Sequence, residues 1–130
     1  MITIEDGLER IKTKYPQAHI EFNEPYEPIL VVPGVRLGEG WNKTICTILS
    51  IIPRGFPAVQ PDRFWVDLPD LRLSNGDQPE YTNTLIDIYG HPQWNNCTTW
   101  FAWILQGWNP NTDSLYTWLK VMERRLRPAR

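Results

Sequence analysis

Several features that define common protein classes are scarce or missing in this chain. Its 130 residues include two cysteines and two histidines, and the formal net charge is −2. No apolar run approaches the ~18 residues that a membrane-spanning helix needs. The near-neutral charge gives no basic surface of the kind that nucleic acids or anionic membranes attract. We therefore expect no nucleic acid and no membrane as partners.

The cysteines, Cys46 and Cys97, are too few for the disulfide framework of a small secreted protein. Together with the two histidines they show no spacing typical of metal ligands, so we predict no metal site. The opening sequence, MITIEDGLER, lacks the apolar core of a signal peptide. We expect a cytoplasmic protein that forms one domain over residues 1–130.

What is present centres on residues 45–67, with the sequence ICTILSIIPRGFPAVQPDRFWVD. A β-branched run opens the segment and predicts a strand that is covered on at least one face. Pro53, Pro57 and Pro61 then follow at four-residue steps. Proline cannot donate to a sheet ladder and fixes its own φ, so the three predict a stiff turn. Phe64, Trp65 and Val66 resume a strand.

The flanking sequence predicts the remaining elements of the first half. Ile4, Leu8 and Ile11 recur at helical spacing behind Thr3, a good N-cap, and Pro16 stops the helix, which we place at residues 3–15. Short strands are expected at residues 18–22 and 29–32, with residues 35–37 as a hairpin arm that extends the second strand, irregular chain at 24–28 and a break at 33–34. No helix interrupts them, so the pattern favours a four-stranded antiparallel meander.

After residue 67 the chain changes character. Residues 68–89 read as a long loop, with one more short strand expected around Leu85, Ile86 and Ile88. Five of the seven tryptophans follow within residues 94–118, and an amphipathic helix is expected at 113–126. The predicted fold class is therefore α+β: N-terminal helix, antiparallel meander, long loop region and C-terminal helix.

This order of elements, with three short motifs inside it, resembles the ubiquitin-conjugating (E2, UBC) superfamily and most closely its divergent bacterial branch. The proline signature of residues 52–64 is similar to the one that ends a strand in that family. Gly90-His91-Pro92 is similar to the His-Pro turn that precedes the family's catalytic cysteine. Trp108-Asn109-Pro110 looks like the Trp-x-Pro entry to a helix. The three motifs lie within residues 45–126 and imply a UBC-like fold.

The resemblance implies a carrier that accepts a ubiquitin-like modifier from an E1-like activating enzyme and passes it to a target amine. A deconjugating peptidase is a further partner in some such systems. The reaction needs neither an organic cofactor nor a metal in the carrier. A thioester stays reactive toward amines, so the carrier needs an accessible thiol.

Cys97 is the expected nucleophile, since polar residues flank it on both sides. The alternative for Cys97 is a small buried residue beside Trp94 and Trp100. Cys46 follows Ile45 in an apolar strand and is expected to fill the core.

Attack on a thioester creates an oxyanion, which needs a hydrogen-bond donor. His91 is a candidate through its imidazole N–H, and Asn95 and Asn96 are candidates through their amides. For His91 the alternative is a structural role, in which the ring pins its turn by bonding a backbone carbonyl. The family has asparagine at the third position of this turn, where this chain has Gln93, and the spacing from the turn to Cys97 is shorter.

A second function stays open at this point. The same fold can serve as a non-catalytic UBC/RWD-like module that binds a protein partner. Seven tryptophans suit that interpretation because aromatic residues anchor interfaces, although tryptophans fill cores more often. A reactive Cys97 would separate the two functions.

Overall fold

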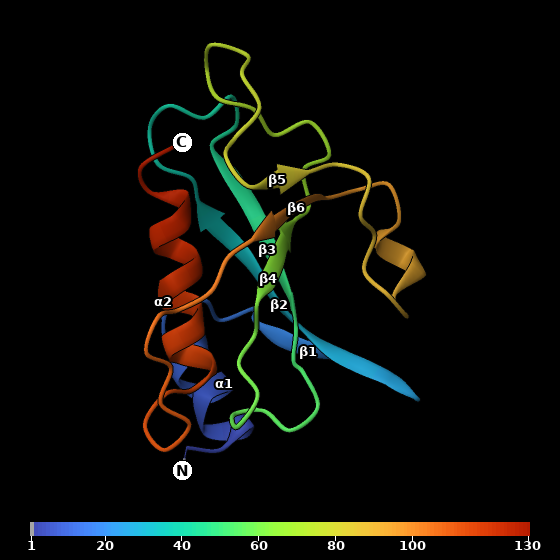
Figure 1. The fold of residues 1–130 in the computed structure, drawn as a ribbon, viewed down its shortest axis with the longest axis vertical. Coiled ribbons are helices and arrows are strands. Elements are labelled where there is room, and N and C mark those ends of the chain that lie inside the picture. The colour runs from blue at the N-terminus through green and yellow to red at the C-terminus, as the bar shows by residue number, and fades with distance from the viewer. Residues whose placement is uncertain (1) are drawn as a thin grey trace.

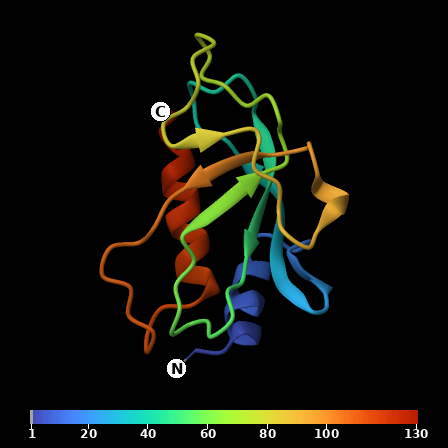
Figure 2. The same cartoon turned by 45° about the vertical axis from the view of Figure 1, so that its right-hand side comes forward.

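Two helices lie on one face of a six-stranded antiparallel sheet in the computed structural model, which describes residues 2–130 (Figure 1). The view in Figure 2 shows α1 (Ile4–Lys12) and α2 (Leu115–Leu126) on the same side of the sheet. No helix within residues 2–130 is long and apolar enough to cross a membrane. The α+β class, with one helix at each end of the chain, is confirmed.

Both helices begin where polar caps allow. The Thr3 hydroxyl accepts a hydrogen bond from the Asp6 amide at 3.0 Å, as an N-cap should. Ser114 caps α2 and forms a reciprocal capping box with Thr117. The helix therefore begins at Leu115, two residues after the expected start at residue 113. The expected apolar stripe of α2 is buried throughout: Leu115, Trp118, Leu119, Met122 and Leu126.

The predicted meander is confirmed as the first four strands: β1 (His19–Asn23), β2 (Tyr26–Arg36), β3 (Ile45–Ile51) and β4 (Arg63–Val66). The expected irregular chain at 24–28 and the expected break at Pro33-Gly34 are wrong in part, because β2 runs from Tyr26 through both prolines. Its register with β3 shifts between Val32 and Val35, so Pro33-Gly34 is a bulge that the strand absorbs.

Two further strands extend the sheet to the order β1-β2-β3-β4-β6-β5. They are β5 (Thr82–Asn83) and β6 (Thr99–Ala102), and β6 pairs with both β4 and β5. The short strand expected around Leu85, Ile86 and Ile88 does not form. Ile88 instead lies in a loop, and its apolar side chain is buried against the sheet.

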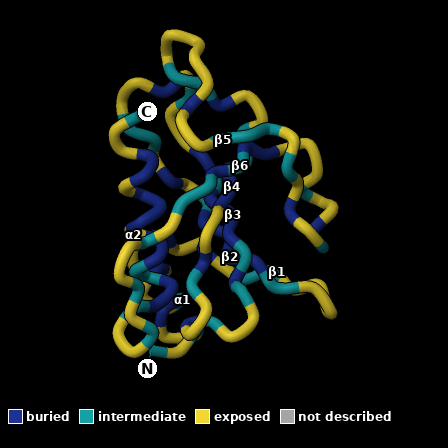
Figure 3. The backbone as a smooth tube through the Cα atoms, viewed as in Figure 1, coloured by how far each residue is buried: buried dark blue, intermediate teal, exposed yellow. Residues whose placement is uncertain are grey.

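The sheet is buried on both faces, by different means. Toward the helices it packs a large core that includes Leu30, Ile48, Phe64 and Phe101. Toward the opposite side it packs a smaller cluster of Ile29, Val31, Leu49, Trp65 and Ile88. Figure 3 shows the sheet centre and the inner helix faces as the buried part of the chain, with the loops exposed around them. The second cluster is covered by the loop of residues 84–97, which places that loop against the sheet.

One buried hydrogen bond joins α2 to the sheet. The indole N–H of Trp118 donates to the Ser50 hydroxyl at 2.9 Å, and both residues are buried. Ser50→Ala should lower the free energy of unfolding by about 1–3 kcal/mol, because the indole N–H is left without a buried partner. The measurement is urea unfolding followed by circular dichroism.

The matched background for this prediction is Trp118→Phe, which removes the donor. In that background Ser50→Ala should cost clearly less, because no partner remains to be orphaned. An equal cost in both backgrounds would show that the hydrogen bond does not couple helix and sheet.

Candidate functional site

Cys97 lies exposed on the loop between the 3-10 helix η1 (Pro92–Trp94) and β6. Its thiol donates a hydrogen bond to the backbone carbonyl of Asn95 at 3.2 Å. The expected exposure on a loop is present, and the alternative of a residue buried beside the tryptophans is not. The sulfur is therefore open to a reagent or a partner protein.

The backbone next to the thiol is held by two hydrogen bonds. The amide of Cys97 donates to the carbonyl of Trp94 at 3.2 Å, and the amide of Asn96 donates to the Asp87 carboxylate at 3.0 Å. Asn96 has φ +60°, a left-handed conformation that asparagine tolerates better than most residues. The position of Cys97 is thus fixed by a turn and by a carboxylate from the preceding loop.

Asn95 and Asn96 are both exposed beside the thiol. Within residues 2–130 neither side-chain amide makes a hydrogen bond. Of the residues that the sequence singles out, these two stay with Cys97 on the same exposed turn. Their amide N–H groups are free to bind a group that arrives at the sulfur.

His91 lies in a different setting, with no exposed surface. Its Nε2 lies 2.8 Å from the carbonyl oxygen of Glu27 in β2, so this nitrogen carries the proton and donates it. Its backbone amide also donates to Ile88, and its carbonyl accepts from Trp94. These contacts favour the structural role for His91, because its N–H is directed at the sheet rather than at the thiol.

The β1–β2 hairpin holds the other side of this loop. The side-chain amide of Asn23 donates to the carbonyl of Gly90 at 2.6 Å. The Glu21 carboxylate accepts from the Trp94 indole at 3.0 Å and from Gln93 at 3.3 Å. Burial alone would raise the pKa of Glu21, but hydrogen bonds from Trp94, His19 and Gln93 outweigh it and the pKa lies below its ordinary value.

Glu21, Asn23 and Asp87 are not singled out by the sequence. Glu21 and Asn23 contact the loop of residues 84–97 from β1, and Asp87 contacts Asn96 nine residues further along the same loop. No local motif marks them, since their role depends on how the hairpin and the loop meet.

The second cysteine has the opposite environment. Cys46 is buried in β3, and burial raises the pKa of its thiol to about 12, with the nearby charge of Asp67 adding to the effect. A thiol in that state holds almost no thiolate at neutral pH. Cys46 therefore fills the core, as the sequence predicts.

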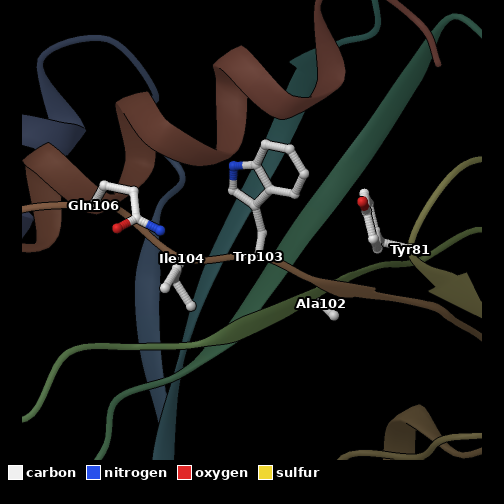
Figure 4. Close-up of a pocket in the computed structure, with 5 residues that line it drawn as sticks. All are labelled: Tyr81, Ala102, Trp103, Ile104 and Gln106. Carbon is white, nitrogen blue, oxygen red and sulfur yellow. The ribbon is translucent and has the colours of Figure 1, made fainter.

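Two hollows bracket β6. One, of about 290 Å³, lies beside the cysteine loop and is lined by Asp87, Ile88, Tyr89, Gly90, Pro92 and Asn95. The other, of about 460 Å³, lies where β6 ends and is lined by Tyr81, Ala102, Trp103, Ile104 and Gln106 (Figure 4). Cys97 precedes β6 and Ala102 is its last residue, so the second hollow lies at the far end of the strand from the thiol. Residues 2–130 contain no group of three or more histidine, cysteine or acidic side chains that could hold a metal ion.

An α+β fold with an antiparallel sheet and one helix at each end of the chain is that of a UBC-like domain. The chain belongs to prokaryotic E2 family E, whose sequence profile matches residues 14–129. The match covers the sheet, the cysteine loop and α2. No curated protein and no solved structure matches the chain.

Gly90 shows how tightly the hairpin and the loop meet. Its φ is +83°, and a Cβ there would lie 2.3 Å from the ring of Tyr26. Gly90→Ala should therefore combine the strain of a left-handed alanine, about 1–2 kcal/mol, with a steric overlap that costs typically about 1–3 kcal/mol more. The measurement is the free energy of urea unfolding.

Gly107→Ala is the matched control, since Gly107 has φ +74° and a Cβ there would meet nothing within 4 Å. It carries the conformational cost alone. If the two variants lose equal stability, Tyr26 yields without cost and the contact does not fix the loop.

Proposed function

We propose that the protein carries a ubiquitin-like modifier as a thioester on Cys97 and transfers it to a target amine. Membership of prokaryotic E2 family E supports a conjugating role in general. The observation that carries the finer claim is the exposed thiol of Cys97 on a loop whose backbone is held from both sides. Cys46, buried and with a raised pKa, does not fit the same role.

The proposed chemistry has two acyl transfers. In the first, the sulfur of Cys97 attacks the carbonyl carbon of a thioester on the activating enzyme, whose thiol leaves with the proton that Cys97 gives up. In the second, an amine nitrogen attacks the new thioester, the carbon–sulfur bond breaks and an amide forms. The Cys97 thiol is then regenerated with a proton from the amine.

Both transfers pass through an oxyanion, for which we propose Asn95 and Asn96 as donors. Their amides are exposed beside the sulfur and have no other hydrogen bond within residues 2–130. We propose His91 as the residue that positions this loop through its bond to Glu27. Its ring would reach an oxyanion only after that bond breaks.

The proposed function determines the partners. The family in general implies an activating enzyme, which uses the nucleotide, and a modifier. A deconjugating peptidase would reverse the product amide. A carrier that works through a free thiol is suited to a reducing compartment, so we place it in the cytoplasm.

Charging tests the proposal directly. Mixed with its activating enzyme, modifier and ATP, the protein should form an adduct that a reducing thiol removes. Cys97→Ala should abolish the adduct, and Cys97→Ser should convert it to an oxyester that resists thiols. Cys46→Ala is the matched control and should still charge, because that thiol is buried. The readout is the mobility shift on a gel with and without reductant.

Two results would contradict this proposal. An adduct that survives Cys97→Ala would place the nucleophile elsewhere. A wild-type protein that never charges with its own partners would favour the non-catalytic binding module. The hollow at the end of β6, with Tyr81 and Ile104 exposed in its wall, supports that second function as a place where a partner could bind.

The proposed oxyanion donors make a separate prediction. Asn95→Ala and Asn96→Gly should still charge, and the donor that acts should lose about 10²–10³-fold in the rate of discharge to an amine. Glycine is chosen at position 96 because it keeps the left-handed backbone. The rate is followed by single-turnover decay of the charged protein.

Asn111→Ala is the control for this pair, since Asn111 is exposed on the loop before α2. It should discharge at the wild-type rate. If both active-loop variants also match wild type, the oxyanion donor lies outside Asn95 and Asn96.

A further inference from the structure

His19 and Glu21 of β1 begin a chain of hydrogen bonds that ends on the loop that carries Cys97. One oxygen of the Glu21 carboxylate accepts from the Trp94 indole at 3.0 Å and from the Gln93 side-chain amide at 3.3 Å. Its other oxygen lies 3.1 Å from Nε2 of His19. The carboxylate therefore joins a histidine of the first strand to two residues of η1.

The His19 ring has a hydrogen-bond acceptor at each nitrogen. Nδ1 lies 3.0 Å from the backbone carbonyl oxygen of Gln17, and Nε2 faces the Glu21 carboxylate. A neutral imidazole has one N–H and can donate to only one of these oxygens, whereas the imidazolium donates to both. The bond to the Gln17 carbonyl, and after it the Glu21 carboxylate, raises the pKa of His19 above its ordinary value despite partial burial. The geometry therefore fits the protonated ring.

No third charge takes part in this contact. Val31 and Ile29 of β2 lie opposite the pair in the ladder, and η1 faces it with a neutral amide and a neutral indole. Within residues 2–130 the pKa of His19 is shifted by no charged group except Glu21, and that of Glu21 by none except His19. The attraction between the two side chains therefore changes with the protonation of His19 wherever Glu21 is ionised.

Trp94 links this contact to the backbone of Cys97. The amide of Cys97 donates to the carbonyl of Trp94 at 3.2 Å, and the amide of Trp94 donates to the carbonyl of His91 at 3.1 Å. The Trp94 side chain packs against the buried cluster that the loop covers, while the Cys97 side chain is exposed. A shift of Trp94 away from Glu21 would therefore move an acceptor that fixes the backbone at Cys97.

We propose that Glu21 is a positioning residue for Cys97, and that a protonated His19 strengthens its contact with the cysteine loop. The inference rests on the proposed function and adds to it a pair of residues far from Cys97 in the sequence. Because the pair acts through Trp94, it affects how the thioester on Cys97 is placed and takes no part in bond formation. Transfer should therefore depend on the charge of His19.

The direction of this dependence follows from the raised pKa of His19. A group whose pKa is higher in the folded state stabilises the fold fully below its ordinary pKa, which is 6.5 for histidine. That contribution is lost as the pH rises through the raised pKa of the folded state. The contact between Glu21 and the loop should therefore be strongest in mild acid and weaker at higher pH.

The first test needs only the purified protein. In a nuclear magnetic resonance titration, the Trp94 indole N–H signal should shift with the same midpoint as the His19 ring signals. In His19→Gln, whose side chain is neutral at every pH, this shift of the Trp94 signal should disappear. The Trp108 indole, which donates to the carbonyl of Pro57 at 2.8 Å, is the control in the same spectra and should show no such midpoint.

The second test measures transfer as a function of pH. Charged protein is mixed with hydroxylamine, which forms a hydroxamate with the modifier and releases the Cys97 thiol, and single-turnover decay is followed. The ratio of wild-type to His19→Gln rates cancels the ionisation of hydroxylamine. It should be about two- to fivefold below pH 6.5, the size of one partly exposed ion pair. It should approach one above the His19 midpoint that the titration gives.

Variants of the carboxylate separate positioning from a general loss of stability. Glu21→Ala removes the acceptor of Trp94 and should slow discharge about tenfold, because a hydrogen bond to a charged group is lost. Glu21→Gln should recover most of this rate, since its amide oxygen still accepts from the indole, but its rate should no longer follow His19. Glu39→Ala is the control and should match wild type, because Glu39 is exposed and its side chain makes no hydrogen bond within residues 2–130.

Three results would overturn the positioning role and leave the carrier intact. The Trp94 signal could ignore the His19 midpoint, the ratio of wild-type to His19→Gln rates could stay constant with pH, or Glu21→Ala could discharge as wild type does. A Glu21→Gln variant as slow as Glu21→Ala, with both less stable in urea, would likewise reduce Glu21 to a structural residue. Failure of wild type to charge is a different result, because it removes the proposed function and the positioning role with it.

Discussion

The arrangement of the site depends on one constraint: residues 84–97 cover a face of the sheet without joining it. A loop placed there must satisfy its backbone polar groups without a ladder. Two strand side chains donate hydrogen bonds to carbonyls of the loop, and one loop side chain donates to a carbonyl of a strand. The hydrogen bonds are Trp65 to the carbonyl of Ile86, Asn23 to that of Gly90, and His91 to that of Glu27. The loop is thereby held by the sheet, and the thiol at its end is exposed on a fixed frame.

How far the sequence predicts this structure follows from the range of each signal. The proline-interrupted segment 45–67, both helices and the first four strands depend on local periodicity and caps. They form close to the expected positions, except that β2 runs through the expected irregular chain and through the expected break at Pro33-Gly34. The short strands β5 and β6 could not be predicted, because two and four residues are too few to show a strand periodicity in a tryptophan-rich segment. The exposure of Cys97 could be predicted from its polar neighbours. The contacts of Glu21 and Asn23 with the loop of residues 84–97 are long-range, and that of Asp87 with Asn96 joins two ends of the same loop, so no local pattern could reveal them.

The two cysteines lie in opposite environments, one buried and one exposed. Cys46 lies in a central strand, where loss of hydration disfavours the thiolate and raises the pKa of the thiol to about 12. Cys97 lies outside the β4–β6 ladder and is exposed, next to the exposed Asn95 and Asn96. The proposed thioester chemistry needs only one such position. The sheet provides it by starting β6 just after the loop that the hairpin holds.

The altered His-Pro turn is explained by the same arrangement. The family has asparagine after this His-Pro pair, whereas this chain has Gln93, whose amide donates to Glu21 in β1. Gln93 therefore serves the attachment of the loop, together with Trp94. The shorter spacing to Cys97 brings two other asparagines, Asn95 and Asn96, directly beside the sulfur. The proposed oxyanion donors, Asn95 and Asn96, are therefore nearer to Cys97 in the chain than Gln93 is.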